Sequence, residues 1–162
     1  MIKRVRIDDA LWDGAHRKRR DDWRVSIADL VDEARLGRED DRLLLISATE
    51  HAVELATFDE DGAPRELLEI ERTHLRAHIE EYLAIIRRIE STDENDASAV
   101  MHSLDMGKKV VHDAGARTLG RLLPSFASDH EAYRRLFSLI LAVVVDVTTL
   151  PGARGHGPPA KR

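Results

Sequence analysis

The sequence contains no cysteine among its 162 residues. Disulfides, thiolate metal sites and cysteine nucleophiles are therefore excluded. The longest nearly uninterrupted apolar run, residues 136–147, is shorter than the ~20 residues of a membrane-spanning helix, and the first residues lack the apolar core of a signal peptide. We therefore expect a cytoplasmic protein that makes no contact with a membrane.

Motifs that identify common enzyme classes are also missing. The sequence has no glycine-rich phosphate loop of the GxxxxGK or GxGxxG type and no GxSxG nucleophile motif. The net charge is −5, and charges of both signs are mixed along most of the chain, so there is no general attraction to nucleic acid. These absences favour a non-catalytic protein that needs no cofactor.

The first half of the chain predicts strands around one helix. Apolar and charged residues alternate around Val5 and Ile7, which predicts a strand. Helical spacing then begins at Asp21 or Asp22 and ends at Gly37. The basic segment before this helix is expected to be a loop or a frayed helix start. Three further strands, joined as a meander by polar turns, are predicted at residues 42–47, 53–58 and 65–70.

The second half predicts three helices. Thr73 is a candidate cap for the first, and Pro124 stops the second. Ser128 and Glu131 have the spacing of a capping box for the third. Apolar residues nearly surround the middle of this last helix, which indicates a central helix covered on several sides.

Strands followed by helices are typical of the α+β class. We expect a single domain over residues 1–150, with an antiparallel sheet of three to four strands packed on one face by about four helices. A polar break is predicted at residues 91–96. The glycine- and proline-rich residues 151–162 are expected to form a disordered tail.

Two glycines lie eight residues apart in the second predicted helix. Gly107 and Gly115 each cost about 1 kcal/mol relative to alanine inside a helix, so we expect another element to approach their backbone closely. They share a side with Val111. The final helix is the expected neighbour of both.

Several stretches resemble the uncharacterised bacterial family UPF0262. The similar stretches occur in the same order as in the family, between residues 2 and 145. They are residues 23–30 (WRVSIADL), 59–62 (DEDG), 104–109 (LDMGKK), 112–115 (HDAG) and 134–140 (RRLFSLI). The resemblance implies a compact cytoplasmic bacterial protein. It implies no activity.

A polar stripe on the second predicted helix is the first candidate site. His102, Asp105, Lys109 and His112 follow one another at spacings of three, four and three residues. Two imidazoles, a carboxylate and an ammonium can transfer a proton or hold an anion. The alternative is a solvated helix face with an ion pair between Asp105 and Lys109.

A second candidate is the HxxxH pair of His74 and His78, with Glu71 and Glu81 nearby. Two histidines on one helix face can bind zinc or another divalent ion. Such a site needs a third ligand, which only the two glutamates offer. We expect no metal here.

The dense basic run is a third candidate, for nucleic acid. Arg17, Lys18, Arg19 and Arg20 can contact phosphates and give salt-dependent binding. Two aspartates follow at once, however, and the whole chain is acidic. A solvated basic segment is the favoured interpretation.

These patterns leave three hypotheses about function. The first is a non-catalytic domain that acts through protein contacts, as a homodimer or an accessory subunit, because the apolar final helix offers more apolar surface than a thin sheet needs. The second is a metal-independent enzyme or small-anion-binding protein that uses the polar stripe. The third is a nucleic-acid-binding regulator. The expected partner is the chain itself or another protein, and a small-molecule ligand stays open.

Overall fold

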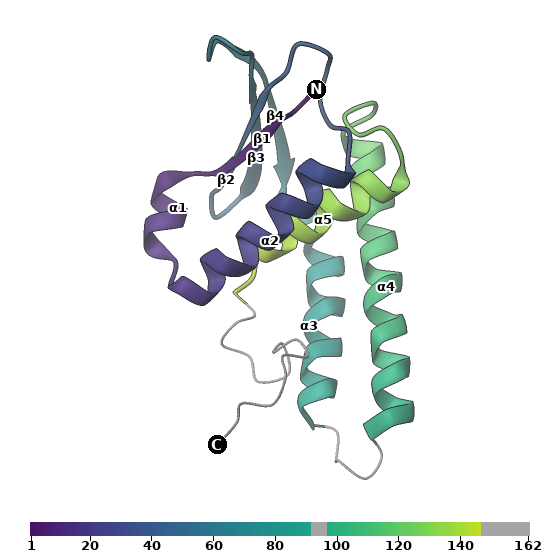
Figure 1. The fold of residues 1–162 in the computed structure, drawn as a ribbon. Helices are drawn as coiled ribbons and strands as arrows, with labels where there is room; N and C mark the ends of the chain where they lie inside the picture. The colour runs from purple at the N-terminus through teal and green to yellow at the C-terminus, as the bar shows by residue number, and fades with distance from the viewer. Residues whose placement is uncertain (92–96, 147–162) are drawn as a thin grey trace.

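A computed structural model describes residues 1–91 and 97–146 of the chain. The predicted tail and residues 92–96 of the predicted polar break lie outside the described residues. Figure 1 shows the order of the elements. They are β1 (Arg4–Ile7), α1 (Asp9–Gly14), α2 (Arg17–Glu33), β2 (Leu43–Ala48), β3 (Ala52–Phe58), β4 (Pro64–Glu71), the 3₁₀ turn η1 (Arg72–His74), α3 (Arg76–Ser91), α4 (Ala97–Leu122) and α5 (His130–Val144).

The four strands form one sheet in the order β1-β2-β3-β4. The last three are antiparallel neighbours, as the predicted meander requires, and β1 runs parallel to β2 with Val5 beside Leu44. A parallel pair needs a long crossover, and α1 and α2 provide it. The α+β class is confirmed, and the sheet is mixed rather than antiparallel throughout because of this crossover.

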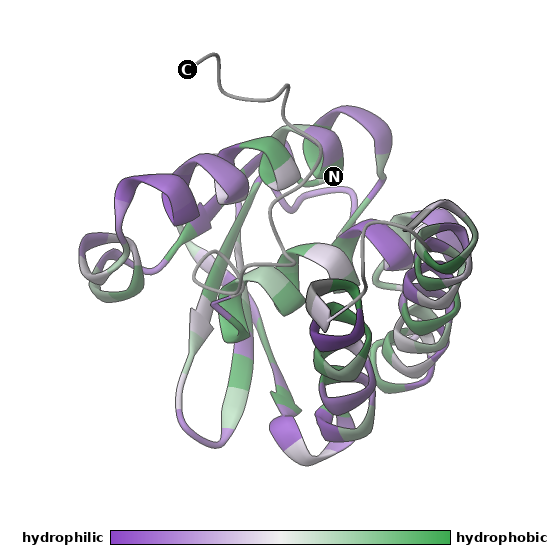
Figure 2. Cartoon of the chain, turned by 90° about the horizontal axis from the view of Figure 1, so that it is seen from below, coloured by the Kyte–Doolittle hydropathy of each residue, from purple (hydrophilic) through white to green (hydrophobic). Residues whose placement is uncertain are grey.

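Helices pack against one face of the sheet, and no described helix covers the opposite face (Figures 1 and 2). Strand residues alternate accordingly. In β3, Val53, Leu55 and Thr57 are buried against the helices, whereas Ala56 and Phe58 on the other face are only partly buried.

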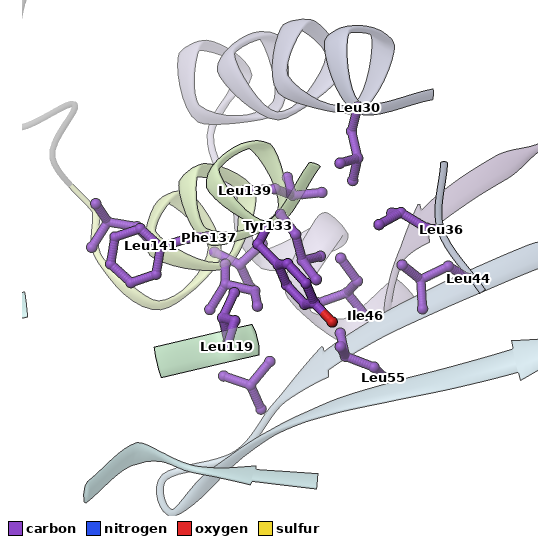
Figure 3. Close-up of a cluster of buried hydrophobic side chains, with 14 of the residues drawn as sticks. Leu30, Leu36, Leu44, Ile46, Leu55, Leu119, Tyr133, Phe137, Leu139 and Leu141 are labelled. Atoms are coloured by element: carbon purple, nitrogen blue, oxygen red, sulfur yellow. The ribbon is translucent and has the colours of Figure 1, made fainter. Parts of the chain in front are cut away.

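The predicted central position of the last helix is confirmed. Leu136, Phe137, Leu139 and Ile140 of α5 have almost no exposed surface. They meet side chains from α2, α4 and the sheet in one cluster (Figure 3). The predicted serine cap is replaced by the next residue, because Asp129 accepts a hydrogen bond from the Ala132 N–H at 2.8 Å. The apolar surface of α5 is therefore covered within the chain itself.

Of the two alternatives for the segment before Asp21, a loop is wrong and a helix start is right, because α2 begins four residues earlier, at Arg17, inside the basic run. The short helix α1 precedes this run and was not expected. The predicted stop at Gly37 is also late, since α2 ends at Glu33. Gly37 lies in the following turn with φ of +73°, where a side chain would be strained and would meet Asp41.

The two glycines of α4 have different neighbours. A Cβ added to Gly115 would lie 2.5 Å from Cζ of Phe137 in α5, which confirms the predicted close approach. A Cβ added to Gly107 would meet only Ile85 of α3, with the terminal methyl at 3.3 Å. The final helix is therefore the neighbour of Gly115 and not of Gly107.

Candidate functional site

The structure does not bring the predicted polar stripe together. His102, Asp105 and Lys109 are exposed on α4, and no ion pair joins Asp105 to Lys109 in the described part of the chain. His112 turns inward instead, where its Nδ1 shares a hydrogen bond of 2.8 Å with Oγ of Ser138 in α5. This histidine belongs to the interior of the helical layer.

A cluster of two histidines surrounds the Phe137 ring. The rings of His78 from α3 and His112 from α4 meet Phe137 edge to face, at centroid distances of 6.0 and 5.6 Å. Nε2 of His78 shares a hydrogen bond of 2.8 Å with Oγ1 of Thr118. Tyr82 meets His112 edge to face as well. Both imidazoles therefore have polar partners inside an otherwise apolar layer.

Burial lowers the pKa of both histidines below the usual value of 6.5. Around His112, the positive charges of Arg134 and Lys108 act in the same direction, and Asp113 opposes them. Both rings are therefore neutral near pH 7. Their geometry fits a structural role that holds α3, α4 and α5 together.

Stability is expected to fall as the pH drops below about 6.5, because the unfolded chain then binds protons that the neutral native His78 and His112 do not. Urea unfolding at about pH 7.5 and about pH 5.5 measures this loss. A variant that carries His78→Gln and His112→Gln should lose less over the same interval, whereas the exposed His102→Gln control should behave like the unmodified chain. Equal losses in all three would contradict the assignment.

A small cavity adjoins Ser138 between α2 and α5. It has a volume of about 180 Å³ and contains both acidic and basic side chains. Arg134 contacts Glu131 at 3.3 Å and Asp113 at 2.9 Å, and Arg135 contacts Glu131 at 3.7 Å. The positive charges are already paired, so this cavity gives little support to an anion site.

His74 and His78, the predicted histidine pair, do not lie together with a third metal ligand among the described residues. His74 is exposed in η1, whereas His78 is engaged with Thr118. Within residues 1–91 and 97–146, no three histidine or acidic side chains are grouped as a metal site requires.

Half of the basic run binds the ends of helices. Arg19 donates to the Val143 carbonyl at 2.8 Å, and Arg20 donates to the Trp12 carbonyl at 2.7 Å. These carbonyls belong to the last turns of α5 and α1, where positive charge is favourable, and the Trp12 carbonyl also accepts a hydrogen bond from the Ala15 N–H at 3.2 Å. Arg17 and Lys18 remain largely exposed. The basic run therefore has a structural explanation without nucleic acid.

A groove that sequence reasoning missed lies beside β1. This β1–α2 groove has a volume of about 580 Å³. All four residues of β1 line it, α2 contributes Ile27 and Val31, and α1 contributes Trp12. Ile27 and Val31 are partly buried and lie beside the fully buried residues of α2. Their helical spacing was the only feature of the sequence that pointed to the groove.

The uncovered face of the sheet is the second exposed apolar surface. Leu45, Ala56 and Leu67 lie side by side across β2, β3 and β4, and Leu43 and Phe58 form the neighbouring row. Leu67 is 63% exposed. Leu43, Leu45 and Phe58 also border a hollow of about 360 Å³ on this face.

Fold and surfaces together define a small α+β domain with an apolar sheet face and a groove beside an edge strand. A family model described as an uncharacterised protein family, UPF0262, matches residues 1–146. The chain belongs to this family, and the membership predicted from the sequence is confirmed.

Relatives in bacteria carry the same family name. The UPF0262 protein of Caulobacter vibrioides strain NA1000 is 31% identical over 150 residues, which cover 88% of this chain and 91% of the relative. The UPF0262 protein of Rhodopseudomonas palustris strain BisB18 is 30% identical over 121 residues, which cover 72% of this chain and 74% of the relative. No solved structure matches the chain. Among its described helices, none combines the length and apolar character needed to cross a bilayer.

Proposed function

We propose that the chain is a non-catalytic interaction domain that acts as a homodimer through the uncovered face of its sheet. The exposed Leu67, at the end of the apolar row that it forms with Leu45 and Ala56, carries this proposal. A sheet with apolar residues on both faces normally has both faces covered. The sequence predicted an interface because of the apolar final helix, but the apolar residues of α5 are buried within the chain. The apolar face of the sheet is the reason for the proposal instead.

The charges around this face favour a second copy as the partner. Arg4 and Arg6 lie on β1 at one side of the face, and Glu54 and Glu69 lie on β3 and β4 toward the other. A two-fold axis brings the same face of both copies together, so that each copy offers both its basic side and its acidic side to the other. The apolar rows of the two copies then pack face to face at about 10 Å.

Leu67→Glu is expected to convert the dimer into a monomer, because it places a carboxylate within the apolar row that the interface buries. Light scattering coupled to size exclusion should give twice the 18.3 kDa chain mass for the unmodified protein and the single mass for the variant at the same concentration. The dissociation constant should rise at least about a hundredfold.

Val25→Glu provides a matched control, because Val25 on α2 is also 63% exposed but lies away from the sheet face. It should leave the dimer intact. A monomeric unmodified chain at high concentration, or equal dissociation by Val25→Glu and Leu67→Glu, would overturn the proposal.

A further inference from the structure

We propose that the β1–α2 groove binds an extended, acidic segment of a partner protein, which adds a strand to the free edge of β1. This second surface shares Arg4 and Arg6 with the border of the sheet face, but not the apolar rows that pair two copies. Three observations carry it: the free edge, the apolar lining and the excess of positive charge.

The outer edge of β1 has backbone groups available for another strand. On the inner side, the Arg4 N–H donates to the Arg42 carbonyl at 3.0 Å and the Asp8 N–H donates to the Ile46 carbonyl at 2.9 Å. Backbone groups alternate in direction along a parallel strand, so those of Val5 and Ile7 point away from β2. An extended peptide beside β1 can bond to both residues.

The groove also offers a place for side chains. Its lining is mainly apolar and includes Trp12, Ile27 and Val31. Alternate side chains of an added strand point the same way, so every second residue of the peptide would enter the groove. A volume of about 580 Å³ holds several aliphatic side chains. The fitting segment therefore has apolar residues at every second position.

The charge of the groove indicates acidic residues at the remaining positions. Its lining contains the basic side chains Lys3, Arg4, Arg6 and Arg24 and the acidic side chains Asp9 and Asp32. Arg6 is paired with Asp9 at 3.2 Å, whereas neither Lys3 nor Arg4 has an ion-pair partner in the described part of the chain. This local excess of positive charge contrasts with the net charge of −5 for the whole chain.

Two other occupants fit the charge poorly. Residues 147–162 of the same chain carry Arg154, Lys161 and Arg162 and no acidic residue. Two copies paired edge to edge through β1 would bring two strands of the same basic character, each with Arg4 and Arg6, side by side, and like charges repel at that distance. A segment of another protein therefore fits best.

Fluorescence anisotropy with a labelled, acetylated peptide that alternates glutamate with valine tests the proposal. It should bind at least about tenfold tighter than the same peptide with lysine in place of glutamate, and its binding should weaken with salt. The Val5 and Ile7 amides should exchange more slowly with solvent when the peptide is bound. Equal binding of the two peptides, binding of neither, or unchanged exchange at both amides would overturn the proposal.

Variants of the full chain locate the site. Lys3→Glu should weaken binding of the glutamate peptide at least about fivefold, whereas Lys109→Glu, which reverses an exposed lysine on α4, should not. Val5→Pro removes an outward N–H and should weaken binding similarly. Leu67→Glu should leave binding unchanged, so that failure of the dimer and failure of this proposal can be told apart. If removal of residues 147–162 raises the affinity at least about tenfold, the chain's own end is the occupant and the proposal is wrong.

Discussion

Gly115→Ala is expected to lower the free energy of unfolding by about 2–3 kcal/mol, although alanine is the better helix former. The added methyl would lie 2.5 Å from Cζ of Phe137, well inside van der Waals contact. That ring is only 1% exposed and is held between His78 and His112, so it has little room to move. The cost of overpacking therefore exceeds the gain of about 1 kcal/mol in helix propensity.

Urea unfolding at a fixed chain concentration measures this effect, and Gly107→Ala is the matched control in the same helix. There the new methyl would meet a terminal methyl of Ile85 at 3.3 Å, which can shift, so stability should stay constant or rise by up to about 1 kcal/mol. Combining Gly115→Ala with Phe137→Leu should cost less than the sum of the two changes. A rise in stability for both glycine variants would show that α4 and α5 do not approach closely.

The elements whose apolar residues follow a clear period were predictable from the sequence. The spacing in α3, α4 and α5 and the alternation in β3 specify which face of each element is buried, whereas the continuous apolar run of β2 does not. The parallel pairing of β1 was not predictable, because it depends on the crossover through α1. The sequence left the basic run open between a loop and a helix start for a related reason, since Arg19 and Arg20 are fixed by carbonyls of other helices.

The polar stripe shows why short spacings mislead over a longer helix. Each residue turns the helix by about 100°, so the ten residues between His102 and His112 leave their side chains about 80° apart. This rotation carries His112 toward the side of Gly115, where Ser138 accommodates it. The β1–α2 groove and the uncovered face of the sheet have no sequence motif, because each is assembled from elements that meet only in the folded chain. Neither could therefore be predicted from the sequence.

Trp23→Ala is expected to cost about 3–5 kcal/mol, because Trp23 has no exposed surface and joins α2 to the end of α5. Its Nε1–H donates to the Ala142 carbonyl at 2.9 Å. The neighbouring Arg19 stacks on the indole at 4.9 Å and binds the Val143 carbonyl. The first turns of α2 thus satisfy two carbonyls in the last turn of α5, which have no intrahelical donor.

Trp23→Phe separates the hydrogen bond from the buried area, since phenylalanine keeps most of the apolar contact but donates nothing. Its expected cost is about 1–2 kcal/mol, from the lost hydrogen bond and the smaller ring. Trp12→Phe is the control, because Trp12 is only partly buried and its indole has no hydrogen bond in the described part of the chain. Urea unfolding with far-UV circular dichroism compares all three variants. If Trp23→Phe cost as much as Trp23→Ala, the carbonyl contact rather than burial would hold α2 against α5.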